Sequence, residues 1–382
     1  MNRTADAVII GGGVSGVAIA YSLAKRGMNH VVVLEQEALS NGATGRCGAG
    51  VRMQWGAELD CLFAQYSIDF FEHANEELDY RGDIGFKQGG YFIVGVSEVE
   101  KTRFSRNVAL QNRLGIPSIL LTPAEAKEIV PHINEAAITC ATFCGRDGHL
   151  NPFHMTQAYA NAATRLGVKI YTGTKVLGIE SEGNRVKTVL TEQGPFSTPV
   201  IVNAAGAYAP LIAEMAGVTL PVYPERHEIL VTEPVASIQG PMFMSFSQNI
   251  YCQQTPEGSF IMGRGDKNEP RSYCIDSSWQ FMEKMAHTCC RLLPMLRQLS
   301  IVRQWAGLYA MTQDRHPIYG EARELKGFFL ACGFSGHGFM FAPATGTVVA
   351  EAILSLPLSL PAEVLDKERF ERGEAIWEPS VV

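Results

Sequence analysis

The stretch of sequence that decides the fold is AVIIGGGVSGVAIAYSLAKRGMNHVVVLE, residues 7–35. Residues 7–10 and 31–34 are short apolar runs, and residues 14–26 repeat small and apolar side chains at helical spacing. Gly27 follows this segment, at a place where glycine commonly ends a helix. The pattern predicts a strand, a glycine loop, a helix and a second buried parallel strand, which is the unit that binds one half of a dinucleotide.

The glycine loop of this unit has the spacing GxGxxG. Gly11 permits a tight turn, Gly13 lets the backbone approach a pyrophosphate, and Gly16 lets the helix pack closely on the strand. The helix that follows directs its N–H groups and the positive end of its dipole at the phosphates. Glu35, 19 residues after Gly16, is placed to accept hydrogen bonds from ribose hydroxyls. The fingerprint predicts a dinucleotide site but does not separate FAD from NAD.

The composition excludes several classes of protein. The chain has 382 residues and a net charge of -7 without any basic block, so nucleic acid is not an expected partner. No apolar run reaches about 18 residues, so no transmembrane segment is expected. The nine cysteines show no repeated CxxC pair, and no metal site is predicted. Their odd number and the lack of a secretory signal favour reduced thiols and a cytoplasmic location.

The remaining segments predict an α/β plus α+β fold, in which a Rossmann-like domain carries an inserted, mainly antiparallel domain. Apolar, glycine-punctuated segments typical of the Rossmann-like domain return twice after the opening unit, and polar alternating segments lie between them. The predicted cofactor-binding domain comprises residues 1–85, 151–215 and 326–382, and the predicted substrate-binding domain comprises residues 86–150 and 216–325.

Four further parts of the sequence carry a family resemblance. They are the pair Arg46 and Arg52 and the blocks NAAGAY at 203–208, WAGLY at 305–309 and GFSGHGF at 333–339. Their order resembles that of the D-amino-acid oxidase superfamily of FAD-dependent enzymes, and the likeness runs along the whole chain. Within the superfamily, the chain is similar to sarcosine oxidase and to the β subunits of heteromeric dye-linked L-proline dehydrogenases. The resemblance therefore implies that the dinucleotide is FAD.

The resemblance also implies which residues contact the cofactor. The loop 45–51 resembles the family loop beside the flavin ring, and residues 336–338 resemble the loop whose backbone amides meet its pyrimidine side. Such amides stabilise the negative charge that develops on a reduced flavin. The expected cofactor-binding residues, of which Val176 would contact adenine through its backbone, are Gly11, Gly13, Val14, Ser15, Gly16, Glu35, Gln36, Thr44, Arg46, Cys47, Gly48, Ala49, Val51, Val176, Ala204, Gly206, Gly307, Gly333, Gly336, His337, Gly338, Phe339 and Met340.

Three departures from monomeric sarcosine oxidase refine this picture. Gly307 stands where that enzyme has the cysteine that anchors flavin, so the resemblance implies non-covalent FAD. Met340 stands where it has a carboxylate-binding lysine, so the substrate carboxylate falls to another donor, and Arg52 can grip a carboxylate at two points. Ile261 stands where it has a lysine near the flavin, which fits a dehydrogenase that passes electrons to another carrier.

Each candidate catalytic residue also has a plain structural interpretation. His337 either serves the flavin or substrate or only packs, and His227 either faces the substrate or ends a strand at the surface. Tyr251 and Tyr309 either wall the pocket or belong to the core. Arg52 either binds the substrate or forms a structural ion pair. The predicted catalytic residues are Arg52, His337, Tyr251, Tyr309 and His227, whereas Cys47 is interpreted as a packing residue beside the flavin loop.

The activity that the resemblance implies is oxidation of the C–N bond of a small amino acid or secondary amine, of the proline, hydroxyproline or sarcosine type. Hydride transfer to flavin N5 would leave an imine. The chain would be the catalytic subunit of a heteromeric dehydrogenase, with a partner subunit that accepts electrons and room for FMN at the subunit interface. Two alternatives stay open: a self-sufficient glycine or sarcosine-type oxidase that produces hydrogen peroxide, and an electron-transfer or scaffold flavoprotein subunit.

Overall fold

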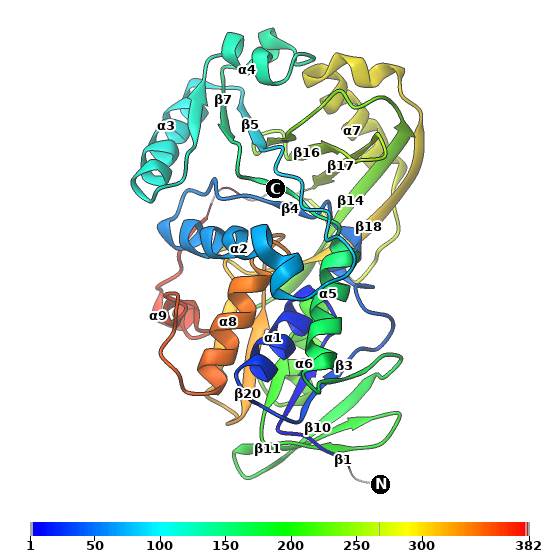
Figure 1. Ribbon diagram of the computed structural model, residues 1–382, viewed down its shortest axis with the longest axis vertical. Helices are drawn as coiled ribbons and strands as arrows, with labels where there is room; N and C mark the ends of the chain where they lie inside the picture. The colour runs from blue at the N-terminus through cyan, green and yellow to red at the C-terminus, as the bar shows by residue number, and fades with distance from the viewer. Residues whose placement is uncertain (1–2, 267, 379, 381–382) are drawn as a thin grey trace.

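The chain is arranged in two lobes around two large β-sheets, as the ribbon of Figure 1 shows. The computed structural model describes residues 3–266, 268–378 and 380. The lower lobe in Figure 1 carries helices α1, α5 and α8, and the upper lobe carries helices α3, α4 and α7. None of the helices among the described residues is long and apolar enough to cross a membrane.

The lower lobe is built on a six-stranded sheet in the order β19-β20-β13-β2-β3-β9. The five strands from β20 to β9 are parallel to one another, and only β19 runs antiparallel, against β20. Parallel strands with apolar side chains on both faces must be covered on both sides. The strands are β2 (Ala7–Ile10), β3 (Val31–Leu34), β9 (Lys169–Tyr171), β13 (Ile201–Asn203), β19 (Ile318–Glu321) and β20 (Phe328–Cys332).

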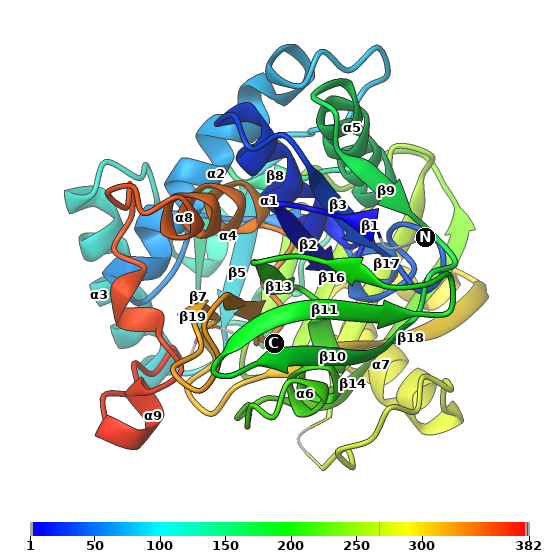
Figure 2. The same ribbon diagram turned by 90° about the horizontal axis from the view of Figure 1, so that it is seen from below.

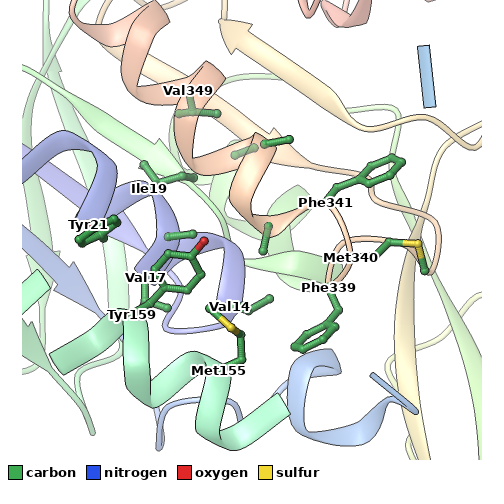
Figure 3. Packing of buried hydrophobic residues seen from close by; sticks show 14 of the residues in the cluster. Val14, Val17, Ile19, Tyr21, Met155, Tyr159, Phe339, Met340, Phe341 and Val349 are labelled. Carbon is green, nitrogen blue, oxygen red and sulfur yellow. The ribbon is translucent and has the colours of Figure 1, made fainter. Parts of the chain in front are cut away.

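Helices cover one face of this sheet. Ile9 and Val33 point into a core shared with α1 (Val14–Lys25), α2 (Glu58–Glu77), α5 (Pro152–Arg165) and α8 (Ala342–Ile353). Figure 3 shows this packing, with Val17 of α1 beside Tyr159 of α5 and Phe339 on the loop that enters α8. The tight contact of α1 with α8 depends on Gly346, where a Cβ would lie 2.8 Å from the carbonyl oxygen of Ala18.

A small second sheet and α6 (Ala209–Met215) cover the other face. Val8 and Val32 point into a core shared with this sheet, whose strand order is β1-β12-β11-β10. Figure 2 views the molecule from the end that carries β10 and β11. The strands are β1 (Arg3–Thr4), β10 (Val176–Glu182), β11 (Arg185–Thr191) and β12 (Phe196–Ser197).

The upper lobe is built on an eight-stranded sheet in the order β18-β14-β17-β16-β15-β5-β7-β6. All neighbours are antiparallel except β15 and β5, which run parallel. The strands are β5 (Tyr91–Gly95), β6 (Ile119–Leu121), β7 (Cys140–Cys144), β14 (Tyr223–Pro234), β15 (Met242–Ser245), β16 (Ile250–Gln254), β17 (Ser259–Gly265) and β18 (Ile301–Met311). The helices of this lobe are α3 (Glu98–Arg113), α4 (Pro123–Ile129) and α7 (Trp279–Leu292), and a two-stranded pair, β4 (Gly50–Val51) with β8 (Gly148–His149), joins the lobes.

The fold class predicted from the sequence is confirmed, and the domain boundaries stay a prediction. Two long helices, α2 and α5, carry no prediction from the sequence. The start of α2 has no local signal, because Ala57 stands at its N-cap and no side-chain cap is formed there. One parallel pair, β15 with β5, lies within a sheet that is otherwise antiparallel, as the mainly antiparallel prediction allows.

Candidate active site

The glycine fingerprint adopts the geometry that the sequence predicts. Gly11 has φ +118°, and a Cβ there would lie 2.4 Å from the carbonyl oxygen of Ala204. A Cβ on Gly16 would lie 2.0 Å from the carbonyl oxygen of Gly11, which no side chain tolerates. Glycine at both positions is therefore required for the close packing of β2, α1 and the loop after β13.

The N-terminus of α1 is open to an anion. Gly13 stands at the N-cap without a side-chain hydrogen bond, and the first turn holds no acidic residue. The N–H of Val14 donates to Thr44 Oγ1 over 3.2 Å, so the loop before β4 also reaches this helix end. Glu35 accepts hydrogen bonds from the N–H of Gly12, at 2.7 Å, and from the N–H of Glu37, at 2.9 Å. The uncapped helix end with its dipole and the adjacent Glu35 carboxylate together fit a pyrophosphate and a ribose.

The loop after the 3-10 helix Ala43–Arg46 connects the two lobes. Arg46 Nη1 donates to the carbonyl oxygen of Ala306 over 3.0 Å, and a Cβ on Gly307 would lie 3.0 Å from Arg46 Cβ. Gly48 accepts a 2.7 Å hydrogen bond from Gln253 Nε2 of β16. Burial raises the pKa of the Cys47 thiol to about 11, so the thiol stays protonated at neutral pH, in agreement with a packing role.

Aromatic side chains line the face of the upper sheet that looks toward this loop. The ring of Tyr251 lies across Gly263 and against Gly48, where Cβ atoms would come within 2.1 Å and 2.9 Å of it. The rings of His227 and Tyr309 stack with centroids 3.6 Å apart, and His227 Nε2 is 3.1 Å from Glu225 Oε1. Glycines opposite these rings make the space in which the rings lie flat.

A cavity between the lobes brings several predicted residues together. Its lining includes Arg46, Cys47, His227, Tyr251, Gly307 and Tyr309. These residues come from four separate segments of the sequence, so their meeting is a result of the fold. Their roles toward cofactor and substrate stay predictions.

The second glycine loop, residues 333–338, lies beside this cavity. A Cβ on Gly336 would be 2.4 Å from the ring of Tyr309. Ser335 has φ 47°, a left-handed conformation that is strained for a residue with a side chain. The N–H of His337 donates to the carbonyl oxygen of Phe334 over 2.9 Å, so this amide is not free for a flavin. The predicted contact of the loop with a flavin therefore falls to the neighbouring amides.

The imidazole of His337 is fully enclosed. Neither ring nitrogen has a hydrogen-bond partner, and the ring lies 5.1 Å from that of Trp55. Burial lowers the pKa of His337 far below its ordinary value, with further lowering by the charges of His316 and Arg52. The ring is therefore neutral at physiological pH and offers one donor and one acceptor.

The guanidinium of Arg52 lies next to this histidine. It stacks 3.6 Å over the ring of Trp55, and its side chain is 2% exposed. Its Nη atoms donate to the carbonyl oxygens of Gln54 and Ser380, whereas Nε has no hydrogen-bond partner among the described residues. Burial lowers the pKa of Arg52, and the nearest acidic groups counter this only from a distance, because no ion pair joins Arg52 to any described residue. The structural ion pair considered above is therefore absent from the described part of the chain.

Other predicted residues lie at the edges of the site. Phe339 and Met340 are buried in the same core, where the ring of Phe339 stacks on Phe71 of α2. Figure 3 shows both side chains on the loop that enters α8. Val176 is the buried first residue of β10, and Gln36 is exposed after β3. Ser15 lies in the first turn of α1, and Gly206 begins the 3-10 helix after β13. Ala49 and Val51 lie on the loop that enters and forms β4, and Gly333 and Gly338 lie on the second glycine loop.

Sequence reasoning missed several residues of this region. Tyr91 is 1% exposed, and burial raises the pKa of its hydroxyl. This hydroxyl also interacts electrostatically with Arg52 and with the hydroxyl of Tyr309. Phe246 lies within 5.3 Å of the Arg52 guanidinium. Gln253 has a buried Oε1 without a partner. The alternation of β5 and β16 was the available signal, but it does not tell which face of a strand meets the other lobe.

These features define a dinucleotide-binding enzyme whose nucleotide fold opens onto a cavity against a second sheet. The open end of α1, the glycine contacts and the unpaired buried atoms of His337 and Gln253 fit FAD as the dinucleotide. The FAD-dependent oxidoreductase family, DAO, matches residues 6–352, and the chain belongs to this family.

Known proteins similar to the chain agree with the predicted resemblance. The β subunit of sarcosine oxidase from Rhodobacter capsulatus is 27% identical over 378 residues, which cover 98% of this chain and 90% of that subunit. The crystal structure of L-proline dehydrogenase from P. horikoshii is 38% identical with a TM-score of 0.92, over 98% of this chain and 100% of that one. Glycine oxidase from Geobacillus kaustophilus is 25% identical with a TM-score of 0.88, over 96% and 99% of the two chains. The predicted family and fold are thereby confirmed.

Proposed function

We propose that the chain oxidises the C–N bond of a small amino acid or secondary amine, of the proline, hydroxyproline or sarcosine type, to an imine. The observation that carries the proposal is the Arg52 guanidinium, a buried cation without an acidic partner among the described residues. It lies near Tyr91, whose hydroxyl also interacts with Tyr309 of the aromatic cavity. Burying a cation without an anion costs several kcal/mol, about what an incoming carboxylate would offset. The likeness to L-proline dehydrogenase and to the sarcosine oxidase β subunit supports the same substrate class.

The chain's residues divide the work of binding and orientation. Arg52 holds the substrate carboxylate, and Tyr251 and Tyr309 enclose the carbon skeleton in the cavity. The neutral His337 offers hydrogen bonds without adding a charge near the substrate. FAD, when bound, accepts the hydride from the carbon next to nitrogen. The substrate binds with its amine deprotonated, so no general base is required of the protein.

The FAD is held non-covalently in this proposal. Gly307 provides no thiol on the cavity wall. Burial raises the pKa of the Cys47 thiol, which therefore stays protonated and donates a hydrogen bond to the carbonyl oxygen of Thr44 at 3.1 Å. The predicted residues of the fingerprint, of the loop 45–51 and of the loop 333–338 are assigned to FAD, with Val176 toward adenine.

A heteromeric dehydrogenase is the favoured setting. The relative from Rhodobacter capsulatus is a β subunit, which supports a partner subunit here. In the proposal this partner accepts the electrons, and an FMN can be bound at the subunit interface as part of the same proposal. The side chain of Ile261 on β17 is apolar and packs against the core cluster that includes Tyr251, so this position carries no cation. The nine unpaired cysteines support the predicted cytoplasmic location. The likeness to glycine oxidase favours one alternative, a self-sufficient oxidase that makes hydrogen peroxide.

The proposal is tested by mixing the FAD-loaded protein with amino acids and N-methyl amines without oxygen and following the visible flavin absorption. Bleaching by at least one small amino acid is expected. Bleaching by none would leave only the electron-transfer or scaffold role. Admission of air then separates the two catalytic settings, because slow recovery of the absorption supports the dehydrogenase and rapid recovery supports the oxidase.

A further inference from the structure

Glu378 is a buried carboxylate far from the fingerprint and outside every segment assigned a role so far. Its side chain is 0% exposed. Glu378 Oε2 accepts hydrogen bonds from the N–H groups of Gly56, at 3.2 Å, and Ala57, at 3.0 Å, and Oε1 accepts one from the N–H of Ser380, at 2.6 Å. No ion pair joins it to a basic side chain in the part of the chain that the structure describes. The carboxylate thus accepts hydrogen bonds from three backbone N–H groups, and the carboxyl group of Asp60 lies beside it.

These contacts supply what the sequence around α2 lacks. Ala57 stands at the N-cap of this 20-residue helix and has no side chain that can cap it. Glu378, more than 300 residues away, instead accepts a hydrogen bond from the N–H of this N-cap residue, and its negative charge complements the positive end of the helix. The carboxylate therefore fixes the turn that enters α2.

The same turn carries Arg52. Trp55, directly before the turn, lies under the guanidinium, and its indole N–H donates to the carbonyl oxygen of Arg52 over 3.0 Å. Ser380, whose N–H is held by Glu378, accepts a hydrogen bond from Arg52 Nη2 through its carbonyl oxygen. Glu378 thus holds the turn that follows Trp55, on which the guanidinium stacks. It also holds Ser380, one of the guanidinium's two hydrogen-bond partners.

We infer that Glu378 is a positioning residue for Arg52, which sets the direction from which the guanidinium meets a substrate carboxylate. The inference rests on the proposed function for the identity of that carboxylate. It goes beyond the proposal because Glu378 belongs to none of the segments assigned to substrate or cofactor. It acts through the turn 54–57 and through Ser380, and its charge also acts on Arg52. Loss of the Glu378 carboxylate should weaken binding of carboxylate ligands and leave ligands without a carboxylate unaffected.

A purely structural role predicts a different result. If Glu378 only capped α2, its loss would lower the thermal unfolding temperature and affect all ligands alike. Asp60, in the first turn of α2, lies against Glu378, and burial raises the pKa of Asp60 to about 6. The test variant is Glu378→Gln, because glutamine keeps the shape of the side chain and removes only its charge. Glu378→Ala, which removes the whole carboxylate, serves as a second and more severe variant.

The experiment compares wild-type, Glu378→Gln and Glu371→Gln holoenzymes. Glu371 is exposed on α9 (Arg369–Arg372) in the same part of the chain, so its change removes the same charge without touching the turn. Steady-state rates with L-proline and inhibition by pyrrolidine, which lacks the carboxylate, are measured together. Flavin difference spectra then give the Kd of pyrrole-2-carboxylate.

Glu378→Gln is expected to raise the KM for L-proline and the Kd of pyrrole-2-carboxylate about tenfold, with kcat and pyrrolidine inhibition nearly unchanged. Glu371→Gln is expected to match the wild type. Equal weakening of pyrrolidine and pyrrole-2-carboxylate, or an unchanged Kd, would overturn the inference. If no amino acid reduces the wild-type flavin, the proposed function fails by itself. The Kd of pyrrole-2-carboxylate then decides the inference alone. Equal Kd values for the wild type and Glu378→Gln, or no binding to the wild type, would overturn the inference.

Discussion

Replacing Arg52 with methionine separates binding from stability more sharply than any other single change. The guanidinium is 2% exposed, stacks on Trp55 and donates to two carbonyl oxygens, but no described acidic residue pairs with it. Methionine fills a similar volume. Losing the two hydrogen bonds costs about 1–3 kcal/mol for each carbonyl left unpaired. Removing a buried cation regains several kcal/mol, so the free energy of unfolding should change by less than about 2 kcal/mol.

The effect on activity should be far larger. Two charge-assisted hydrogen bonds to a substrate carboxylate contribute about 1.5–3 kcal/mol each, which is about 3–6 kcal/mol in total and a loss of about 10²–10⁴ in kcat/KM. The assay is steady-state oxidation of L-proline with a dye acceptor, beside thermal unfolding. Arg303→Met is the matched control, because Arg303 is exposed and lies 5.9 Å from the ring of Trp305. A kcat/KM within threefold of the wild type would refute the carboxylate role, and collapse of the fold would refute the stability argument.

Three further predictions concern the cofactor and the buried carboxylates. Gly16→Ala is expected to abolish FAD binding, because its Cβ would lie 2.0 Å from the carbonyl oxygen of Gly11, and retention of the flavin spectrum after gel filtration would contradict this. Acid precipitation of the wild type should release all FAD into the supernatant, because Gly307 offers no thiol; flavin left in the pellet would indicate a covalent bond. Burial raises the pKa of Asp147 from 3.8 to about 7, so the folded state favours the protonated carboxyl. The free energy of unfolding should then fall by about 4 kcal/mol as pH rises from about 4 to about 7. This slope should be smaller in Asp147→Asn, and equal slopes in urea titrations of the two proteins would argue against a buried, protonated Asp147.

The parts of the site that the sequence predicts are those encoded by local spacing. Gly11, Gly16 and Glu35 lie within one strand–helix–strand unit, and their contacts follow from its geometry. Outside the site, Thr122 and Glu125 form a capping box at the start of α4, which is a contact of the same local kind.

The parts that the sequence does not predict depend on distant contacts. Tyr91 and Gln253 reach the site only because β5 and β16 turn one face toward the loop 45–51, and strand alternation leaves that choice of face open. The cap of α2 comes from Glu378, so no local pattern marks the start of this helix. Arg52 was identified as a candidate by resemblance, but the absence of an ion pair to any described residue is visible only in the fold.

The central claim is that this FAD-dependent oxidoreductase removes a hydride from the carbon next to an amine nitrogen. A single anaerobic turnover of the FAD-loaded protein with L-proline, analysed for both flavin absorption and product, tests it most directly. The claim predicts that each FAD reduced yields one cyclic imine, the substrate less two hydrogens. Flavin that stays oxidised with L-proline, sarcosine and every other amino acid and N-methyl amine tried, or flavin reduced without any imine formed, would contradict it.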